Sequence, residues 1–479
     1  MPAKTRRRAL ALRRLLAVVV SLTPLLVTYA RDRRRYILFG GPREVDSPTR
    51  RKRARRVHDV FVELGPTFIK LGQVLSTRAD ALPPEYTREL SRLQDQVPPA
   101  DWRGVEEIIR EDVGDPRLMY DSFDRRPVNS ASIGQVYEAE AEDRRLAVKV
   151  RRPGVEDVVE ADLAALQMLE RAVSRFVSED TQFTIDNVVA QFEEVLMEEL
   201  DYRLERANMK EMHEDFAADP EVRIPRVDDD LSGDRVITME YVDSTKITRV
   251  HELADVDSGD VARRLQRTYA RMVLDNGLFH ADPHPGNLGV APDGAIVIYD
   301  FGAVGRLRQE TKDLLFEFYE GLHDEDINHL IAVFVELDML PTDVDRDQVE
   351  RMFRGMIADL KTEGVEGDAG NLVTYVQDNL RGHRVRVPRE MVLMFRMVST
   401  LEGVCKQMDE SFNFTYEAYV YVLRERSDAV AMAYERMPEF IRDRVDAETM
   451  VALKRRAEEF AGYVDELAEA FSDAGESRS

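Results

Sequence analysis

The segment HADPHPGN, residues 280–287, is followed thirteen residues after its last position by DFG, which begins at Asp300. The first segment places Asp282 five residues before Asn287. Such an aspartate can orient or deprotonate an attacking hydroxyl, while an amide and a second carboxylate can hold a metal ion that bridges phosphates. The run GAIVIY at 294–299 predicts a strand that leaves a hairpin turn and carries the metal ligand at its end. These features predict a phosphoryl-transfer site in which Mg²⁺ neutralises charge.

Protein kinases use the same order of residues, and a kinase-like ATP site is therefore the favoured interpretation of the loop. Two other interpretations stay open. His280, Asp282 and His284 alternate and could be metal ligands of a hydrolase, or the loop could be purely structural. Against a hydrolase, Pro283 and Pro285 predict an extended loop, and the other histidines of the chain form no second cluster of ligands.

The 479 residues suffice for two or three domains, or for one two-lobed domain with extensions. The formal charge of −24 is uneven: residues 1–56 carry 17 Lys+Arg and 3 Asp+Glu, a net of +14, which leaves −38 for the remainder. The acidic body would repel nucleic acid, so no nucleic-acid partner is expected. Acidity together with ten lysines against 57 arginines favours a halophilic protein, although a GC-rich genome also raises arginine. Cys405 is the single cysteine, which excludes an intrachain disulfide and indicates a cytosolic chain.

An uncharged run, LLAVVVSLTPLLVTYA at 15–30, lies between arginines in the basic head. Its sixteen residues fall short of the roughly 20 that span a bilayer, and Pro24 interrupts them. The preferred interpretation is an interfacial or shallowly inserted anchor whose flanking arginines meet anionic head groups. We therefore expect a cytoplasmic protein at the inner face of the cell membrane. A true span, a signal peptide and a soluble basic head stay open.

A second motif lies on a predicted helix. Apolar residues at 57, 60, 61, 64, 68, 71 and 75 form a helical stripe that kinks or restarts at Pro66. Lys70 and Gln73 project from one face of this helix, and Gly72 would let another backbone approach closely. From spacing alone, Lys70 is no more than a solvated lysine on an ordinary helix.

The segments VNSASIGQVYEA at 128–139 and RLAVKV at 145–150 predict a small-residue loop and two strands. This is the arrangement of a nucleotide-covering loop followed by a phosphate-pairing lysine, here Lys149. No G-x-G-x-x-G is present, so a backbone cradle for phosphate would rest on Ala131, Ser132 and Gly134.

With these motifs the chain resembles the UbiB/ADCK (AarF) family of atypical kinases over about residues 57–425. The pairing of K-x-G-Q with E-x-D is specific, whereas DFG alone is not. Asn129 and Ser130 stand where the family loop commonly begins with alanines, which leaves the nucleotide preference open. The matching motifs are KLGQ at 70–73, SASIGQV at 130–136, ELDY at 199–202 with ERAN at 205–208, and the HADPHPGN and DFG segments.

The resemblance implies an α+β, two-lobed kinase-like fold with a β-rich N-lobe and a helical C-lobe. A helical N-terminal extension would carry the K-x-G-Q motif, and an acidic helical tail would end the chain. The expected boundaries are 1–56 for the basic membrane-proximal segment, 57–125 for the extension, 126–243 for the N-lobe, 244–425 for the C-lobe and 426–479 for the tail.

The resemblance also implies roles for the site residues. Lys149 would contact the phosphates of ATP and pair with a glutamate, for which Glu199 is the first choice and Glu205 the second. The extension helix would fold over the site, so that Lys70 and Gln73 point into it and phosphorylation of proteins in trans is disfavoured.

Asp282 would be the catalytic aspartate, with Asn287 and Asp300 on Mg²⁺. The backbone of the interlobe hinge, at Glu240 and Val242, would bind adenine.

The expected function is that of a membrane-associated kinase or ATPase that supports isoprenoid-quinone synthesis or lipid homeostasis. Its expected partners are an anionic lipid surface, quinone-pathway enzymes or a lipid-like small molecule. A small-molecule phosphotransferase of the aminoglycoside or choline kinase type and a non-catalytic nucleotide-sensing scaffold stay as alternatives.

Overall fold

The larger sheet grows from two segments of alternating apolar and polar residues, GQVYEAEA and RRLAVKVR. They form β3 (Gly134–Ala141) and β4 (Arg144–Arg151), which pair antiparallel across a two-residue turn. Glu142 and Asp143 in this turn have φ of 50° and 58°, the left-handed backbone that suits a tight hairpin. The strand order is β1-β3-β4-β7-β6, with β2 also on β3. The other strands are β1 (Ser122–Phe123), β2 (Asn129–Ser130), β6 (Val227–Asp228) and β7 (Val236–Glu240).

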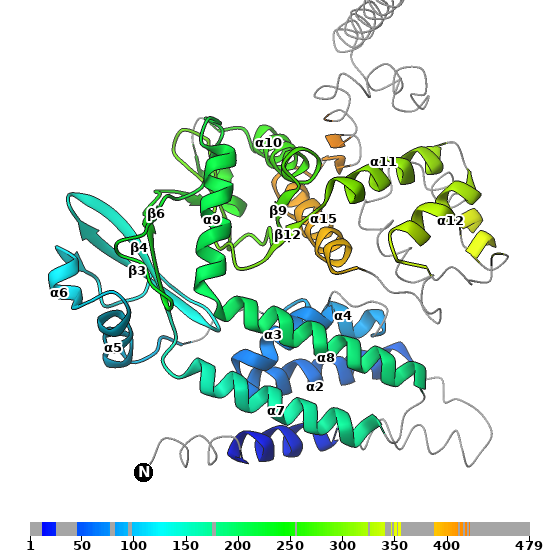
Figure 1. The fold of residues 1–479 in the computed structure, drawn as a ribbon, viewed down its shortest axis with the longest axis horizontal. Coiled ribbons are helices and arrows are strands. Elements are labelled where there is room, and N and C mark those ends of the chain that lie inside the picture. The colour runs from blue at the N-terminus through cyan, green and yellow to red at the C-terminus, as the bar shows by residue number, and fades with distance from the viewer. Residues whose placement is uncertain are drawn as a thin grey trace, which may run out of the picture.

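Figure 1 shows this sheet in one lobe, with α5 (Trp102–Asp112) and α6 (Pro116–Met119) at its outer edge, and a mainly helical second lobe. The helix α9 (Tyr202–Phe216) stands between the two lobes. The two-lobed α+β fold expected from the sequence is confirmed. The expected tail at 426–479 lies outside the described residues. The computed structural model describes residues 12–24, 46–76, 82–93, 98–174, 179–253, 256–323, 326–340 and 388–410, with parts of 346–355 and 412–421.

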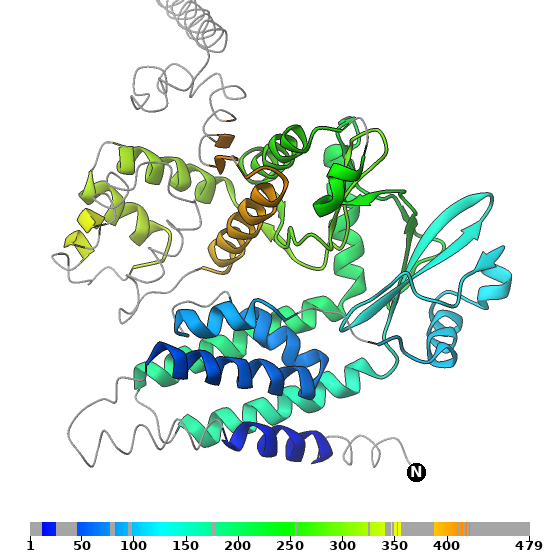
Figure 2. The same cartoon turned by 180° about the vertical axis from the view of Figure 1, so that it is seen from behind.

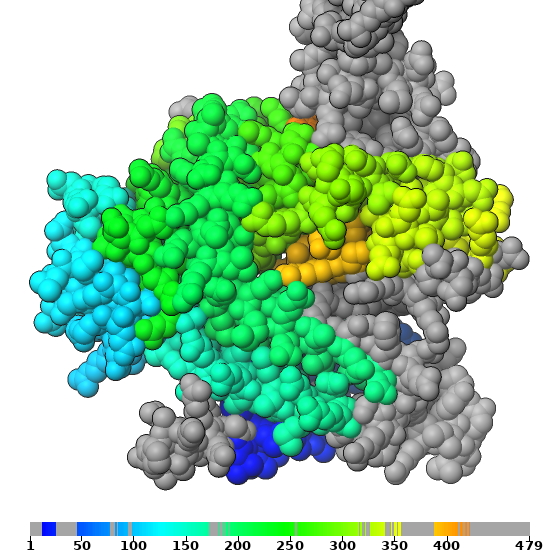
Figure 3. Space-filling model, viewed as in Figure 1, coloured from blue at the N-terminus to red at the C-terminus, as the bar shows by residue number. Residues whose placement is uncertain are grey.

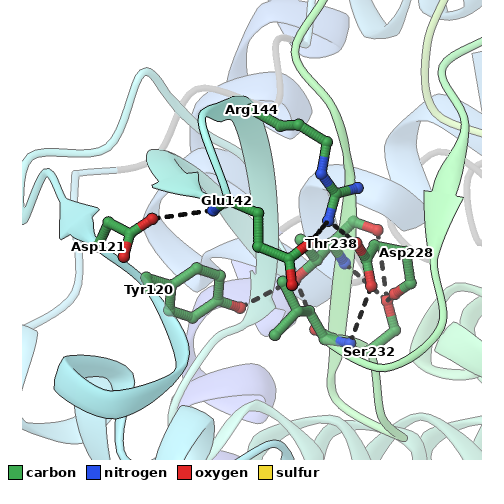
Figure 4. A network of polar contacts seen from close by, with 8 residues as sticks. Tyr120, Asp121, Glu142, Arg144, Asp228, Ser232 and Thr238 are labelled. Carbon is green, nitrogen blue, oxygen red and sulfur yellow. Dashed lines mark hydrogen bonds and ion pairs between the residues drawn. The ribbon is translucent and has the colours of Figure 1, made fainter.

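A polar network fastens the outer edge of the β-rich lobe (Figure 4). The Tyr120 hydroxyl lies 3.0 Å from that of Thr238, which donates to the Leu231 carbonyl at 2.6 Å. Arg144 pairs with Asp228 at 2.9 Å. Burial raises the pKa of Tyr120 to about 12, so its hydroxyl stays protonated and hydrogen-bonded. The network holds β7, which leads directly into the segment between the lobes.

A layer of helices lies along one side of both lobes (Figures 1 and 2). The helix expected from the apolar stripe ends at Leu64 and restarts at Pro66, because Gly65 breaks it with a φ of 93°. Phe68 and Phe192 are fully buried at the centre of the layer. Its members are α2 (Ser47–Leu64), α3 (Pro66–Ser76), α4 (Pro84–Leu90), α7 (Val155–Ser174) and α8 (Glu179–Leu200).

The first part of the uncharged run of the head packs on this layer. Residues 12–24 form a helix whose Val18 is fully buried, and Arg14 pairs with the buried Asp162 at 2.6 Å. One face of the expected anchor is therefore covered by protein rather than lipid, while residues 25–30 lie outside the described part. In the described ranges of the chain, no helix has both the length and the apolar character needed to cross a membrane.

The second lobe is built around a long helix that ends at a glycine, Gly277. The helix α10 (Ser258–Arg271) continues into a π turn (Met272–Asn276), and Gly277 stops it with a φ of 72°. The same lobe holds two small sheets, β5-β11-β10-β8 and β12-β9, and the connections between their strands carry the predicted loops. The strands are β5 (Val222–Arg223), β8 (Thr245–Lys246), β9 (Leu278–His280), β10 (Leu288–Val290), β11 (Ile296–Ile298) and β12 (Val304–Arg306). The other helices are the short 3₁₀ helix (Ile247–Glu252), α11 (Gln309–His323), α12 (Ile327–Glu336) and α15 (Arg389–Met408).

Candidate active site

The predicted catalytic loop connects β9 to β10, and DFG connects β11 to β12. His280 at the end of β9 ties the two together. Its Nε2 donates to the Asp300 carbonyl at 2.8 Å, so its Nδ1 accepts from the Tyr269 hydroxyl at 2.8 Å. Burial lowers the pKa of His280, which keeps the ring neutral and fixes this tautomer. The hydrogen bond from His280 to the Asp300 carbonyl helps to hold Asp300 at a φ of 58°, a strained backbone conformation for a residue other than glycine.

Lys149, Glu205 and Asp300 form one charge cluster. The Lys149 Nζ lies 2.5 Å from Glu205 Oε1 and 3.3 Å from Asp300 Oδ1. Burial and the Asp300 charge raise the pKa of Glu205 to about 7, against the opposing effect of Lys149. Removal from water alone would raise the pKa of Asp300, but Lys149, the Gly302 amide and Lys70 together outweigh it, and the pKa falls to about 2. Lys149, which we expect to bind phosphates, thus lies between Glu205 of α9 and Asp300, the expected metal ligand.

The first choice for the partner of Lys149, Glu199, is wrong. Glu199 pairs with Lys70 instead, and Glu205 pairs with Lys149. The reason is the break at Asp201, whose carboxylate accepts from the amide of Arg203 at 3.1 Å and caps α9. Glu199 therefore belongs to the last turn of α8, while Glu205 belongs to the first turn of α9.

Lys70 faces the site, as the resemblance implies. Its side chain is buried against Glu199, and its charge lowers the pKa of both Asp282 and Asp300. The Gln73 amide instead donates to the carbonyl of Leu93, beyond the end of α4, at 3.3 Å. Its side chain thus contacts the extension itself rather than the cluster of carboxylates.

Gly72 leaves room for the side chains of neighbouring residues, whereas the sequence suggested that it would let another backbone approach. A Cβ at this position would lie 2.2 Å from Leu93 Cδ1 and 2.8 Å from Phe61 Cδ2. The glycine lets α3 seat closely on α2 and on the end of α4.

Asp282 and Asn287 lie together in the catalytic loop, since the Asn287 amide donates to the Asp282 carbonyl at 3.1 Å. The Asp282 carboxylate also pairs with Arg396 of α15 at 2.8 Å. Burial would raise the pKa of Asp282, but Arg396 and then Lys70 lower it. Sequence reasoning missed Arg396, which lies in a helix that reads as core packing, and it missed the support of His280 by Tyr269.

The small-residue loop is a tight turn in which the Ala131 amide donates to the Gly134 carbonyl at 2.9 Å. Ser132 is buried within it, and Arg152 donates to the Ala131 carbonyl at 2.7 Å from behind. Gly134 is required because a Cβ would lie 2.3 Å from the Tyr202 hydroxyl. The loop therefore rests on the first residue of α9, the helix that also carries the partner of Lys149.

At the interlobe segment, the Glu240 amide donates to the Arg226 carbonyl at 2.8 Å. The Val242 carbonyl accepts from the Tyr299 hydroxyl at 3.2 Å, one residue before Asp300. The segment is thus tied to the strand that carries DFG.

Residues 92–334 match the family model of the ABC1 atypical kinase-like domain. The chain is 31% identical over 430 residues to the uncharacterized protein sll1770 of Synechocystis. The aligned region covers 87% of this chain and 73% of that protein. The chain belongs to the ABC1/UbiB family of atypical kinases. It is also 33% identical over 385 residues, 78% of this chain, to the chloroplastic protein ACTIVITY OF BC1 COMPLEX KINASE 1 of Arabidopsis thaliana.

This ABC1 family protein spans 55% of that plant relative and 57% of another, ACTIVITY OF BC1 COMPLEX KINASE 7. A solved structure of Rv3197 with erythromycin from Mycobacterium tuberculosis is 24% identical and covers 75% of this chain, with a TM-score of 0.48. The family match begins after Lys70 and ends before Arg396. Two cations of the site thus lie outside the matched residues.

The donors present in this ABC1 domain fit Mg²⁺. Asn287 and Asp300 offer an amide and a carboxylate oxygen, the hard ligands this ion takes, and Mg²⁺ usually needs only one or two from protein. The Asp300 side chain is 45% exposed and can reach a ligand. The hydrolase interpretation loses support, because His280 has both nitrogens engaged and no group of three metal-binding side chains exists among the described residues.

Proposed function

We propose that this ABC1 family protein binds Mg²⁺·ATP between its lobes and transfers the terminal phosphoryl group to water or to a small or lipid-like acceptor. The observation that carries the proposal is the cluster of Lys149, Glu205 and Asp300 beside the catalytic loop. A buried lysine held between two carboxylates is arranged for phosphate rather than for stability alone.

Each side chain has a defined task in this reaction. The acceptor oxygen bonds to the terminal phosphorus, the bond from that phosphorus to its bridging oxygen breaks, and ADP leaves. Asp282 orients the acceptor and takes its proton, and Lys149 neutralises the phosphates. Asn287 and Asp300 would hold Mg²⁺, which would supply positive charge to neutralise the phosphates. The Glu240 carbonyl and the Val242 amide are the groups we expect at adenine.

The position of the helical extension is an argument that the phosphoryl acceptor is small. Lys70 is buried against Glu199, and its charge acts on Asp282 and Asp300. As the family resemblance implies, we expect the extension to occupy the place of a protein substrate. A water molecule or a lipid head group needs less room there than a folded protein. We infer that the reaction supports isoprenoid-quinone synthesis or lipid homeostasis.

The helix of residues 12–24 supports contact with a membrane. Its outer face exposes Leu12, Leu16 and Val20 at 59%, 57% and 69%. The run RRKR at 50–53 lies in the next helix of the same layer and adds positive charge. Apolar side chains beside arginines suit the boundary of an anionic bilayer at the inner face of the membrane.

The test is ATP hydrolysis by the purified full chain with Mg²⁺ in high salt, with and without anionic liposomes, beside Asp300→Asn. Turnover that liposomes stimulate and that Asp300→Asn abolishes is the expected result. Nucleotide binding without turnover in any lipid would favour a nucleotide sensor. Turnover that is indifferent to Lys70→Ala would favour a small-molecule phosphotransferase.

A further inference from the structure

The helix α15 brings an arginine into the site from far along the chain. One face of α15 packs into the core of the second lobe through Met397, Leu401 and Cys405, all buried. Figure 1 shows the helix beside β9 and β12, the strands that flank the two catalytic segments. In the space-filling view its surface is visible between α11–α12 and α8 (Figure 3). Arg396 lies on this helix.

Arg396 reaches the carboxylate that the mechanism uses. Its Nη2 lies 2.8 Å from Asp282 Oδ1, and the two side chains are only 20% and 25% exposed. In such partial burial an arginine–carboxylate bond is charge-assisted and directional, stronger than an ion pair on the open surface. Because α15 is held in place by the core, Arg396 fixes the orientation of the Asp282 carboxylate.

We propose that Arg396 is a positioning residue of the phosphoryl-transfer site, which holds the carboxylate of Asp282 in the orientation that the acceptor requires. This inference rests on the proposed function, in which Asp282 orients the acceptor. It extends the site to α15, beyond residues 92–334 that match the family domain. A small displacement of a catalytic group can lower a rate about 100-fold, so the arginine need not touch ATP to matter.

The same helix supplies a matched control. Arg389 lies seven residues earlier, two helical turns, and therefore on nearly the same face as Arg396. It pairs with Glu194 at 2.9 Å and with Glu198, both on α8. Its loss would weaken the contact between α15 and the helical layer without touching Asp282.

The experiment is steady-state ATP hydrolysis with Mg²⁺ by the full chain in high salt. Its variants are Arg396→Met, Arg396→Lys, Arg389→Met, Asp282→Asn, Asp300→Asn and the double variant Asp282→Asn/Arg396→Met, with circular dichroism to verify folding. We expect Arg396→Met to lower kcat about 100-fold with little change in the KM for ATP. Arg396→Lys should recover part of the loss, since it keeps the charge but not the planar fork. Arg389→Met should stay within about twofold of the wild type.

The double variant separates positioning from general support. If Arg396 acts through Asp282, its loss should add nothing once Asp282 is asparagine. An equal effect of Arg396→Met in both backgrounds, or equal losses in Arg396→Met and Arg389→Met, would overturn the proposal. Turnover by the wild type that is no higher than that of Asp300→Asn would overturn the proposed function and this inference with it.

Discussion

Two of the lysine–glutamate pairs among the described residues lie at the candidate site, and they differ in what they join. Lys149 and Glu205 connect a strand of the N-lobe to α9, and Asp300 completes their cluster. Lys70 and Glu199 connect the helical extension to α8. The two glutamates come from one stretch of chain, divided at Asp201. The comparison teaches that one helical junction, at Asp201, directs one glutamate to the lysine of the N-lobe sheet and the other to the lysine of the helical extension.

Breaking the first pair should have the largest effect. Lys149→Met leaves Glu205 and Asp300 as neighbouring carboxylates without their cation, and it removes the expected contact to phosphate. We expect ATP turnover to fall about 1,000-fold in a steady-state assay. Lys210→Met is the control, because Lys210 is a partly exposed lysine of α9 that pairs with Asp229 and lies outside the cluster. A similar loss in both variants would mean that α9, rather than the phosphate site, had been damaged.

Breaking the second pair should change the extension first. Lys70→Met leaves Glu199 without the cation that it faces in a partly buried place, at a cost of about 2 kcal/mol. We expect faster amide hydrogen exchange in α3, with β3 and β4 unchanged. Mass spectrometry of exchange in both lysine variants measures this. Exchange that rises in the N-lobe sheet instead would contradict the division of roles.

The Glu205 carboxyl should make the stability of the fold depend on pH. Its folded pKa of about 7 lies above its ordinary 4.5. The folded state therefore holds this proton more tightly, so the stability it contributes is present below pH 4.5 and is lost as the pH rises through 7. Urea unfolding of the nucleotide-free chain at pH 5 and pH 7.5 should show the free energy of unfolding, relative to Glu205→Gln, falling with pH. A difference that rises or stays flat would contradict the buried position of Glu205.

Two glycines give a contrast in stability, and Gly403→Ala has the smallest effect that we expect. Gly72→Ala forces a methyl against Leu93 and Phe61 and should cost about 1–3 kcal/mol, moving the Lys70 helix without changing any charge. Gly403→Ala in α15 meets nothing within 4 Å and should stabilise the fold by about 0.5–1 kcal/mol. Thermal unfolding of both variants measures the contrast. Equal shifts would mean that the tight packing of α3 is not a constraint.

The parts of the site that lie close in sequence could be predicted, because loop spacing and the strand before Asp300 fix their geometry. The partner of Lys149 could not be ranked correctly, since spacing does not show that the chain changes direction at Asp201. Arg396 could not be predicted, because it lies 114 residues after Asp282 in a methionine-rich helix whose pattern indicates only core packing. The apolar run at 15–30 could not reveal that Val18 packs on the helical layer of α2, α3, α4, α7 and α8. A helical stripe that faces protein and one that faces lipid have the same sequence pattern.

Isothermal titration of Mg²⁺·ATP into the wild type, Lys149→Met and Lys70→Met tests the central contrast most directly. The account predicts that Lys149→Met weakens binding at least about tenfold, because the phosphates lose their cation, while Lys70→Met binds within about threefold of the wild type. Equal losses in the two variants would contradict it, since Lys70 would then belong to the nucleotide site as fully as Lys149.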